Sequence, residues 1–296
     1  MDVASEPLIS VIMNCYNSDR FLKEALASVF AQSYQNWELV FWDNQSSDAS
    51  ASIIQALADP RIQYFYAPRH TGLGEARNLA VAQARGEWLA FLDCDDYWTP
   101  EKLVRQVAMI QSGDQRLGLV YSRAAIVGGK YHGRELAADY KGKALPEGNV
   151  LREYLMSDNF IPLLSAVVRR DVFWAVGGIA PDFKQAEDFY LFAAIAAQYE
   201  VRADQEISCY YRMHDHNLSI RQKELACEEA LRVIEAFWSL VPQAQERTHE
   251  KTRLMSRYKV LSGFFKIQAR KNILSGFSTL LGHPILTLQT LAHHFK

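Results

Sequence analysis

The sequence predicts an α/β fold with a mostly parallel central sheet and a helical extension at the C-terminal end. Short apolar runs alternate with helical patterns over the first 110 residues, and this alternation is typical of right-handed βαβ units. Three carboxylates, Asp93, Asp95 and Asp96, directly follow one of the apolar runs. From about Gln222 onward the spacing of apolar residues is helical up to the end of the chain.

The predicted strands of the first half are short runs rich in β-branched and aromatic residues, at 8–13, 37–42, 62–66 and 88–92. Helices are predicted between them, at 21–30, from residue 48 to about residue 58, and at 71–84. Thr99 and Pro100 predict the start of the next helix, with Thr99 as N-cap and Pro100 in the first helical position. The second half is more mixed, with strands predicted at 117–127, 163–168 and 206–212 and a helix at 187–198.

The composition indicates a globular protein of 296 residues, with 49% hydrophobic residues and a net charge of −2. This charge implies no affinity for nucleic acid. From Arg221 onward, however, there are 12 Lys and Arg residues against 6 Asp and Glu residues. A basic tail of this kind is expected either to expose a solvated helix face or to meet an anionic membrane surface.

The cysteines are scattered and indicate reduced thiols in a cytosolic protein; they are Cys15, Cys94, Cys209 and Cys227. The N-terminal residues lack the basic and apolar regions of a signal peptide. The most apolar stretch, 273–292, is interrupted by polar residues and a proline, so it is a poor spanning helix. We therefore expect a cytoplasmic protein. Peripheral contact with the inner face of the membrane is a second possibility within this expectation.

The acidic cluster after residue 92 predicts a ligand site at one edge of the sheet. A desolvated carboxylate costs several kcal/mol unless it is paired or bound to a metal, so the cluster has to lie beyond the buried strand. The carboxyl ends of parallel strands share one edge, where open α/β sheets bind ligands. There the carboxylates can hold a divalent cation and, through it, a phosphate.

Two further polar segments are expected at the same edge. Residues 14–17 follow the first strand, and Asp43 follows the second, where its carboxylate can accept hydrogen bonds from a nucleobase or a ribose. Arg77 can add a fixed positive charge. Together these residues predict a site for a nucleotide diphosphate, although a turn, a helix cap or a surface salt bridge explains each one taken alone.

These motifs resemble those of the family 2 glycosyltransferases, inverting bacterial-type enzymes with the GT-A fold, a Rossmann-like fold for nucleotide-diphospho-sugars. Residues 10–17 resemble the first strand and its Pro-x-Tyr-Asn loop, with Asn14 where proline is common. Residues 42–48 resemble the Val-Asp-Asp-Gly-Ser-Thr-Asp motif, with Asn44 at the second acid. Residues 71–78 resemble the Gly-x-x-x-Ala-Arg-Asn segment, and Asp93-Cys94-Asp95 resembles the DxD motif.

Two segments of the mixed half extend the resemblance. Glu187 and Asp188 resemble the Glu-Asp motif at a helix start, which implies that Asp188 is the catalytic base and Glu187 an alternative or a supporting residue. Helix capping is the competing explanation, because acids are favoured in a first turn. The segment from Tyr211 to His214 resembles the Tyr-Arg-x-His motif, whose histidine helps to hold the metal or the diphosphate.

The resemblance implies an enzyme of polysaccharide biosynthesis that moves a sugar from a nucleotide-diphosphate donor to an acceptor hydroxyl. It implies Mg²⁺ or Mn²⁺ on Asp95 and His214, with Asp96 in support. A UDP- or dTDP-type donor is expected in preference to a GDP-type one, with a glycan or a lipid-linked acceptor. The residues expected to bind the nucleotide and donor are Asn14, Tyr16, Asn17, Asp43, Arg77, Asp93, Cys94 and Asp95.

The expected organisation is a catalytic domain at 1–220, divided into a nucleotide-binding half at about 6–98 and an acceptor half at about 99–220. A helical extension follows at 221–296. Its apolar stripe, which alternates with basic residues, can pack on the catalytic domain, pair with another subunit or lie on a membrane; packing is the default. The stripe comprises Leu261, Phe264, Phe265, Ile267, Ile273, Leu274, Phe277, Leu280 and Leu281.

Three other function classes remain to be weighed. A dinucleotide-dependent oxidoreductase needs a Gly-x-Gly-x-x-Gly fingerprint after the first strand, and no glycine occurs there. A sugar nucleotidyltransferase has a similar architecture but needs a glycine-rich loop at the same place. A non-catalytic sugar-nucleotide-binding protein is the third alternative, against which the full set of acids argues.

Overall fold

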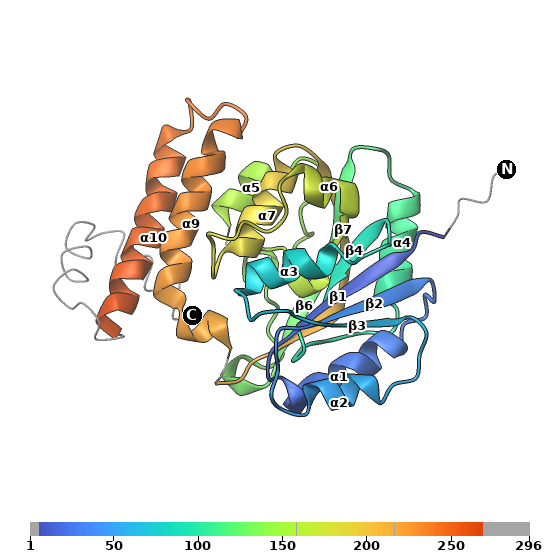
Figure 1. Ribbon diagram of the computed structural model, residues 1–296. Coiled ribbons are helices and arrows are strands. Elements are labelled where there is room, and N and C mark those ends of the chain that lie inside the picture. The colour runs from blue at the N-terminus through green and yellow to red at the C-terminus, as the bar shows by residue number, and fades with distance from the viewer. Residues whose placement is uncertain (1–5, 158, 216, 269–296) are drawn as a thin grey trace.

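The computed structural model describes residues 6–157, 159–215 and 217–268, and one eight-stranded sheet runs through this part of the chain (Figure 1). The strand order is β3-β2-β1-β4-β7-β6-β8-β5. The first four strands pair in parallel; they are β1 (Ile9–Cys15), β2 (Trp37–Asp43), β3 (Ile62–Tyr66) and β4 (Trp88–Phe91). Residues of β1, β2 and β4 are almost all buried, which is typical of parallel strands with helices on both faces.

The mixed half supplies the other side of the sheet. Its strands are β5 (Tyr97–Trp98), β6 (Leu117–Val127), β7 (Val167–Arg169) and β8 (Glu200–Arg212). Strand β7 is antiparallel to both β4 and β6, whereas β6 and β8 are parallel and β5 is antiparallel to β8. The mostly parallel α/β sheet that the sequence predicts is confirmed.

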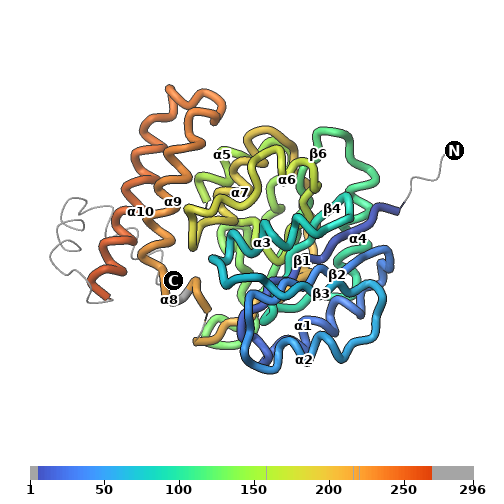
Figure 2. Tube along the Cα trace, in the orientation of Figure 1, coloured from blue at the N-terminus to red at the C-terminus, as the bar shows by residue number. Residues whose placement is uncertain are grey.

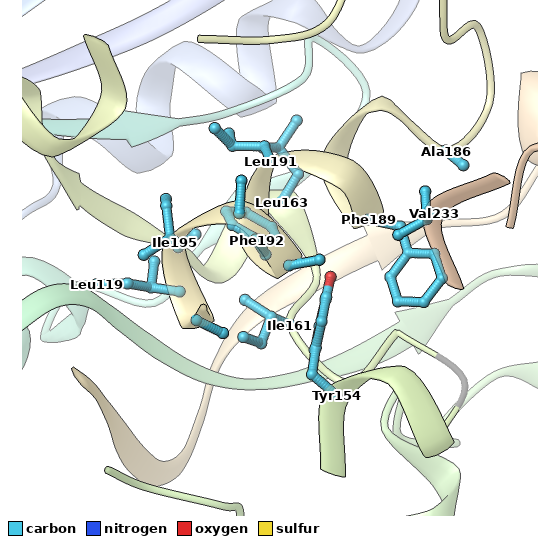
Figure 3. Packing of buried hydrophobic residues seen from close by; sticks show 14 of the residues in the cluster. Leu119, Tyr154, Ile161, Leu163, Ala186, Phe189, Leu191, Phe192, Ile195 and Val233 are labelled. Atoms are coloured by element: carbon cyan, nitrogen blue, oxygen red, sulfur yellow. The ribbon is translucent and has the colours of Figure 1, made fainter. Parts of the chain in front are cut away.

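Helices cover both faces of this sheet (Figure 1). On one face lie α1 (Asp19–Phe30), α2 (Ser50–Gln55) and α4 (Lys102–Gln111). On the other lie α3 (Leu73–Val81), α5 (Leu151–Met156), α6 (Arg170–Ala175) and α7 (Glu187–Ala196). Each layer has its own hydrophobic cluster, and the larger one lies beneath α7, where Figure 3 shows Phe189 beside Tyr154 and Val233.

The C-terminal region consists of α8 (Leu218–Arg221), α9 (Lys223–Phe237) and α10 (Thr248–Gln268). Figures 1 and 2 show α9 and α10 side by side, next to α7. Leu261 and Phe265 are buried in the same cluster as α7, so the default packing of the apolar stripe is confirmed for these two residues. The remainder of the stripe from Ile273 onward, and the whole segment 273–292, lie outside the described residues. Within the described residues, every helix is too short or too polar to cross a membrane.

Local sequence signals are wrong at a few element boundaries. Helix α4 begins at Lys102, and Thr99 does not cap it: the Thr99 amide pairs with the Ser208 carbonyl, which continues the β5–β8 pairing. Tertiary pairing therefore overrides the capping signal. Residues 163–165 form a 3₁₀ turn after Pro162, so strand β7 is restricted to Val167–Arg169. Strand β8 begins at Glu200, earlier than expected, and α2, α3 and α7 end two or three residues early.

Candidate active site

Hydrogen bonds connect the loop after β1 with the loop after β2. The Asn44 amide donates to the Cys15 carbonyl (2.8 Å), and the Asn17 side-chain oxygen accepts from the Ser47 amide (2.8 Å). Asn17 and Gln45 both adopt positive φ, 49° and 70°, and asparagine tolerates this region better than most residues. The two loops therefore hold each other in place at the carboxyl edge of the sheet.

Asp43 lies at the end of β2, beside these two loops, and is fully buried. Its carboxylate accepts from the Tyr64 hydroxyl (2.8 Å) and from the Ser46 amide (2.7 Å). Burial and the hydrogen bond to Asp43 raise the pKa of Tyr64. The hydrogen bonds of Asp43 therefore support the loop, and its predicted contact with the nucleotide stays a prediction.

Tyr16 and Asn14 lie beside Asp43 but differ in exposure. Tyr16 is 52% exposed, and its ring centroid lies 4.3 Å from that of His70. The side-chain nitrogen of Asn14 is buried without a hydrogen-bond partner among the described residues. The end of β1 thus carries one exposed aromatic ring and one buried donor without a partner among the described residues.

Asn44 has a function that the sequence did not reveal. Its side-chain oxygen accepts from the Thr71 amide, and its side-chain nitrogen donates to the Thr71 carbonyl (2.9 Å). A carboxylate could not make the second bond, because it has no proton to donate. Asn44, at the position of the motif's second acid, therefore holds the loop that leads into α3 through these two hydrogen bonds. The replacement of an acid by asparagine in the motif was the sequence signal that could have predicted this contact.

Arg77 of α3 connects the two halves of the site. It is buried, and its guanidinium donates to Asp93 (3.0 Å) and to Glu187 (2.8 Å). These partners lie 16 and 110 residues away in sequence. Arg77 therefore brings the DxD motif and the Glu-Asp motif together, and both of these charged contacts use its terminal nitrogens.

The acidic cluster after β4 is a set of carboxylates with different environments. Asp95 Oδ2 lies 2.9 Å from His214 Nε2, and Asp96 Oδ1 accepts from the Arg212 amide (2.7 Å). Burial first, and neighbouring carboxylates second, raise the pKa of Asp95 and hold the pKa of Asp96 well above its usual range. The Arg212 side chain also donates to the Asp95 carbonyl (2.9 Å), so it ties β8 to the DxD loop.

The acids converge on one edge, as the sequence predicts. Cys15 pairs with Asp43 in the β1–β2 register, and the Cys94 thiol donates to the Asn14 carbonyl (3.3 Å). The Asp43 loop and the DxD loop therefore flank the same end of β1. Cys94 itself is buried and contacts the protein backbone.

The donor set at Asp95 and His214 fits a divalent cation. Among the described residues no three His, Cys, Asp or Glu side chains form a metal cage on their own. One carboxylate and one imidazole nevertheless suit Mn²⁺ or Mg²⁺ when substrate phosphates and water fill the remaining positions. The 2.9 Å approach of the carboxylate and the imidazole shows that both can reach one point.

Asp188 differs from Glu187 in exposure and in its hydrogen-bond partners. Glu187 is buried and is paired with Arg77, whereas Asp188 is half-buried. Asp188 accepts from Asn159 (3.0 Å) and from the Phe189 amide (2.7 Å). Burial first, and the charge of Glu187 second, raise the pKa of Asp188 to about 7. A carboxylate with such a pKa is suited to accept a proton near neutral pH.

The partner of Asp188 is another residue that sequence reasoning missed. Asn159 accepts from the buried Tyr154 hydroxyl (2.6 Å) while it donates to Asp188. Tyr154 packs against Phe189 with a ring-centroid distance of 5.1 Å. No motif marks this network, because its members come from two segments that are about 30 residues apart in the sequence.

Comparison with known proteins shows the family to which this chain belongs. The family model described as Glycosyl transferase family 2 matches residues 10–177, more than half of the chain. An Escherichia coli UDP-Glc:alpha-D-GlcNAc-diphosphoundecaprenol beta-1,3-glucosyltransferase is 28% identical over 212 residues, which cover 72% of this chain and 78% of the relative.

Two solved structures share the fold at low sequence identity. The S. aureus TarS 1–349 complex with UDP-GlcNAc has a TM-score of 0.69 and 18% identity, and the match covers 92% of this chain and 79% of that one. The Pyrobaculum calidifontis mannosyltransferase complex with GDP-Man and Mn²⁺ has a TM-score of 0.58 and 17% identity, covering 98% and 87%. The chain therefore belongs to glycosyl transferase family 2, and it is a nucleotide-sugar glycosyltransferase with a GT-A fold.

Proposed function

We propose that this protein is an inverting glycosyltransferase in which Asp188 is the general base. The observation that carries the proposal is the position of Asp188 beside Glu187, which Arg77 connects to Asp93 of the DxD motif. The raised pKa of Asp188, about 7, supports the same role. One buried arginine thus connects the residue next to the proposed base with the DxD motif.

In this mechanism Asp188 takes the proton from an acceptor hydroxyl as the hydroxyl oxygen attacks the anomeric carbon. The bond between that carbon and the diphosphate oxygen breaks on the opposite face, and the nucleoside diphosphate leaves. A single displacement of this kind inverts the anomeric configuration. General base catalysis typically contributes about 10²–10⁴-fold to the rate.

Asp95 and His214 would hold Mg²⁺ or Mn²⁺ at the diphosphate, with Asp96 in support through the DxD loop. Such an ion, when bound, supplies electrostatic stabilisation of the negative charge on the leaving diphosphate. The Mn²⁺ in the complex of the Pyrobaculum mannosyltransferase supports this assignment. Asp95→Ala should remove metal-dependent binding of UDP, and unchanged affinity by calorimetry would contradict it.

The donor is proposed to be a UDP- or dTDP-sugar, bound by Tyr16, Asn14 and Asn17 at the end of β1 and by Asp43 and the DxD loop. The UDP-GlcNAc complex of TarS supports a UDP-type donor. The GDP-Man complex of the Pyrobaculum mannosyltransferase makes a GDP-type donor the alternative to test. Thermal stabilisation by UDP-glucose, UDP-GlcNAc, dTDP-glucose and GDP-mannose, each with Mn²⁺ or with EDTA, decides between them, because a ligand of the native state raises the unfolding temperature.

The acceptor is proposed to be a glycan or lipid-linked hydroxyl in cell-surface polysaccharide synthesis, as supported by the lipid-linked acceptor in the name of the E. coli relative. Such an acceptor agrees with a cytoplasmic protein that contacts the inner membrane face through its basic C-terminal region. Flotation with anionic and with neutral liposomes tests the contact. Equal recovery with both lipids would remove it.

Asp188→Asn tests the catalytic assignment directly. Transfer should fall by at least about 10²-fold, because the amide cannot accept the proton. Donor affinity, measured by calorimetry with UDP and Mn²⁺, should stay within about twofold, since the donor contacts are unchanged. Asp182→Asn, an exposed acid six residues earlier, is the matched control. Full turnover in Asp188→Asn would overturn the assignment.

A further inference from the structure

Helix α9 places a buried carboxylate against the segment that leads into α7. Glu229 is only 3% exposed. Its two oxygens accept from three consecutive backbone amides, those of Lys184 (3.0 Å to each oxygen), Gln185 (2.8 Å) and Ala186 (3.0 Å). Within the described part of the chain no lysine or arginine forms an ion pair with Glu229, so these amides stabilise its charge.

The three amides lie directly before the catalytic helix. Ala186 is the N-cap residue of α7, and Glu187 and Asp188 form its first turn. Amides at a helix start have no partner inside the helix, and the positive end of the helix dipole favours a nearby carboxylate. Here the carboxylate comes from a residue 43 to 45 positions further along the chain. The C-terminal region therefore contacts the backbone directly before the first turn of α7.

Apolar contacts from α9 act on the same turn. Phe189 shares a hydrophobic cluster with Val233, which lies beside it in Figure 3. Tyr190 packs edge-on against Phe237 with a ring-centroid distance of 5.1 Å. The residue that follows Asp188 and the one after it are thus both packed on α9, one turn and two turns away from Glu229.

We propose that Glu229 is a positioning residue for Asp188, so that α9 is part of the catalytic apparatus. The inference rests on the proposed function, because it assumes that Asp188 is the base. Asp188 is then held from two directions: Glu187, through Arg77, sets its place relative to the donor side, and Glu229 sets the backbone before it. A displacement of about 1 Å in such a group can cost about 10²-fold in rate.

Glu229→Gln, Glu229→Asp and Glu235→Gln form the variant set. Glutamine keeps the shape of the side chain and one acceptor oxygen, but it loses the negative charge and sets a donor nitrogen against the Lys184 amide, where Glu229 has its second acceptor oxygen. Aspartate keeps both acceptor oxygens on a shorter side chain. Glu235 lies on the exposed face of the same helix and controls for the loss of one charge from α9.

The transfer assay uses UDP-glucose, Mn²⁺ and a synthetic GlcNAc-diphospholipid, with UDP-GlcNAc as a second donor. Glu229→Gln should lower kcat by about 10–100-fold while KM for the donor changes by less than about twofold. Glu229→Asp should recover part of the loss, and Glu235→Gln should match the wild type. A fall in kcat that only follows the unfolded fraction, or wild-type kcat in Glu229→Gln, overturns the proposal.

Two measurements need no substrate. Hydrogen exchange should show faster exchange of the Lys184, Gln185 and Ala186 amides in Glu229→Gln, and ¹³C-carboxyl NMR should show a shifted titration of Asp188. The charged groups that face Asp188 are Glu187 and Arg77, and both are unchanged in this variant. Faster exchange with an unaltered Asp188 titration makes Glu229 merely structural and overturns the proposal. If Glu229→Gln does not fold, the same readings on Glu229→Asp decide.

The two levels of proposal fail in different ways. If Asp188→Asn keeps full transfer, the catalytic assignment fails whatever Glu229 does. If Asp188→Asn is inactive but Glu229→Gln has wild-type kcat and a wild-type Asp188 titration, only the positioning role fails.

Discussion

Replacing Asp188 with asparagine should stabilise the fold in alkaline solution while it removes transfer. The carboxyl has its pKa raised from 3.8 to about 7, by burial first and by Glu187 second. A shift of about 3 pKa units corresponds to about 4 kcal/mol of unfavourable free energy for the ionised form in the folded protein. Asp188 is partly exposed, so solvent screening reduces the expected gain to about 1–3 kcal/mol.

The sign of the effect depends on pH. Between about pH 4 and pH 7 the folded wild type binds more protons at this site than the unfolded chain does, so its unfolding free energy falls as pH rises. Asparagine does not titrate. Its advantage should therefore be absent near about pH 4, grow up to about pH 7 and stay constant above it.

The hydrogen bonds around the new amide are expected to survive in part. The side-chain oxygen of the introduced asparagine can keep the bond from the Phe189 amide, and its side-chain nitrogen then faces Asn159. Rotation of the Asn159 amide brings its oxygen to that nitrogen and its own nitrogen to the Tyr154 hydroxyl. The reversal costs about 1 kcal/mol, because the Tyr154 hydroxyl changes from donor to acceptor, and the range given above includes this cost.

Urea unfolding of the wild type, Asp188→Asn and the exposed control Asp182→Asn at several pH values between about 5 and 9 measures the effect. The same samples are assayed for transfer. A stability difference that does not vary with pH would show that Asp188 titrates normally, and the reasoning from burial would be refuted. A pH-dependent gain in Asp182→Asn as well would show that the effect does not belong to Asp188.

Three further predictions concern other buried polar groups. Arg77→Met should lower the unfolding free energy by about 3–5 kcal/mol, because it leaves Glu187 buried without its cation. In urea titrations the double variant with Glu187→Gln should recover part of this loss. If the two substitutions changed the unfolding free energy by strictly additive amounts, the pairing would be contradicted. Asn44→Asp should cost about 1–3 kcal/mol through the lost bond to the Thr71 carbonyl, whereas an unchanged urea midpoint would count against this contact. Lys102 is fully buried, and burial lowers its pKa to about 8. Lys102→Met should therefore raise the unfolding free energy by about 1–3 kcal/mol at about pH 7, and this gain should become smaller above about pH 8. A gain that increases with pH in urea titrations would contradict the prediction.

The sequence by itself determined which polar residues gather at the carboxyl edge of the parallel strands. Strands β1 to β4 are apolar runs whose polar residues start where burial ends, and parallel strands deliver their carboxyl ends to one side. Asp43 and the DxD acids therefore had to meet around the end of β1, without any knowledge of helix packing. The burial of Leu261 and Phe265 on one face of α10 could likewise be predicted from their spacing, because the helical period decides which side chains share a face.

Tertiary structure decided the pairings that link the separate segments. Nothing local shows that Arg77 takes Asp93 and Glu187 as partners, or that Asn159 reaches Asp188, because such contacts depend on how the helices are placed on the sheet. The same holds for Thr99, whose capping signal lost to pairing with β8. The pattern of apolar residues in a short segment predicts which side chains are buried. The partners of a buried charge cannot be predicted in this way, because they come from whichever elements pack around it.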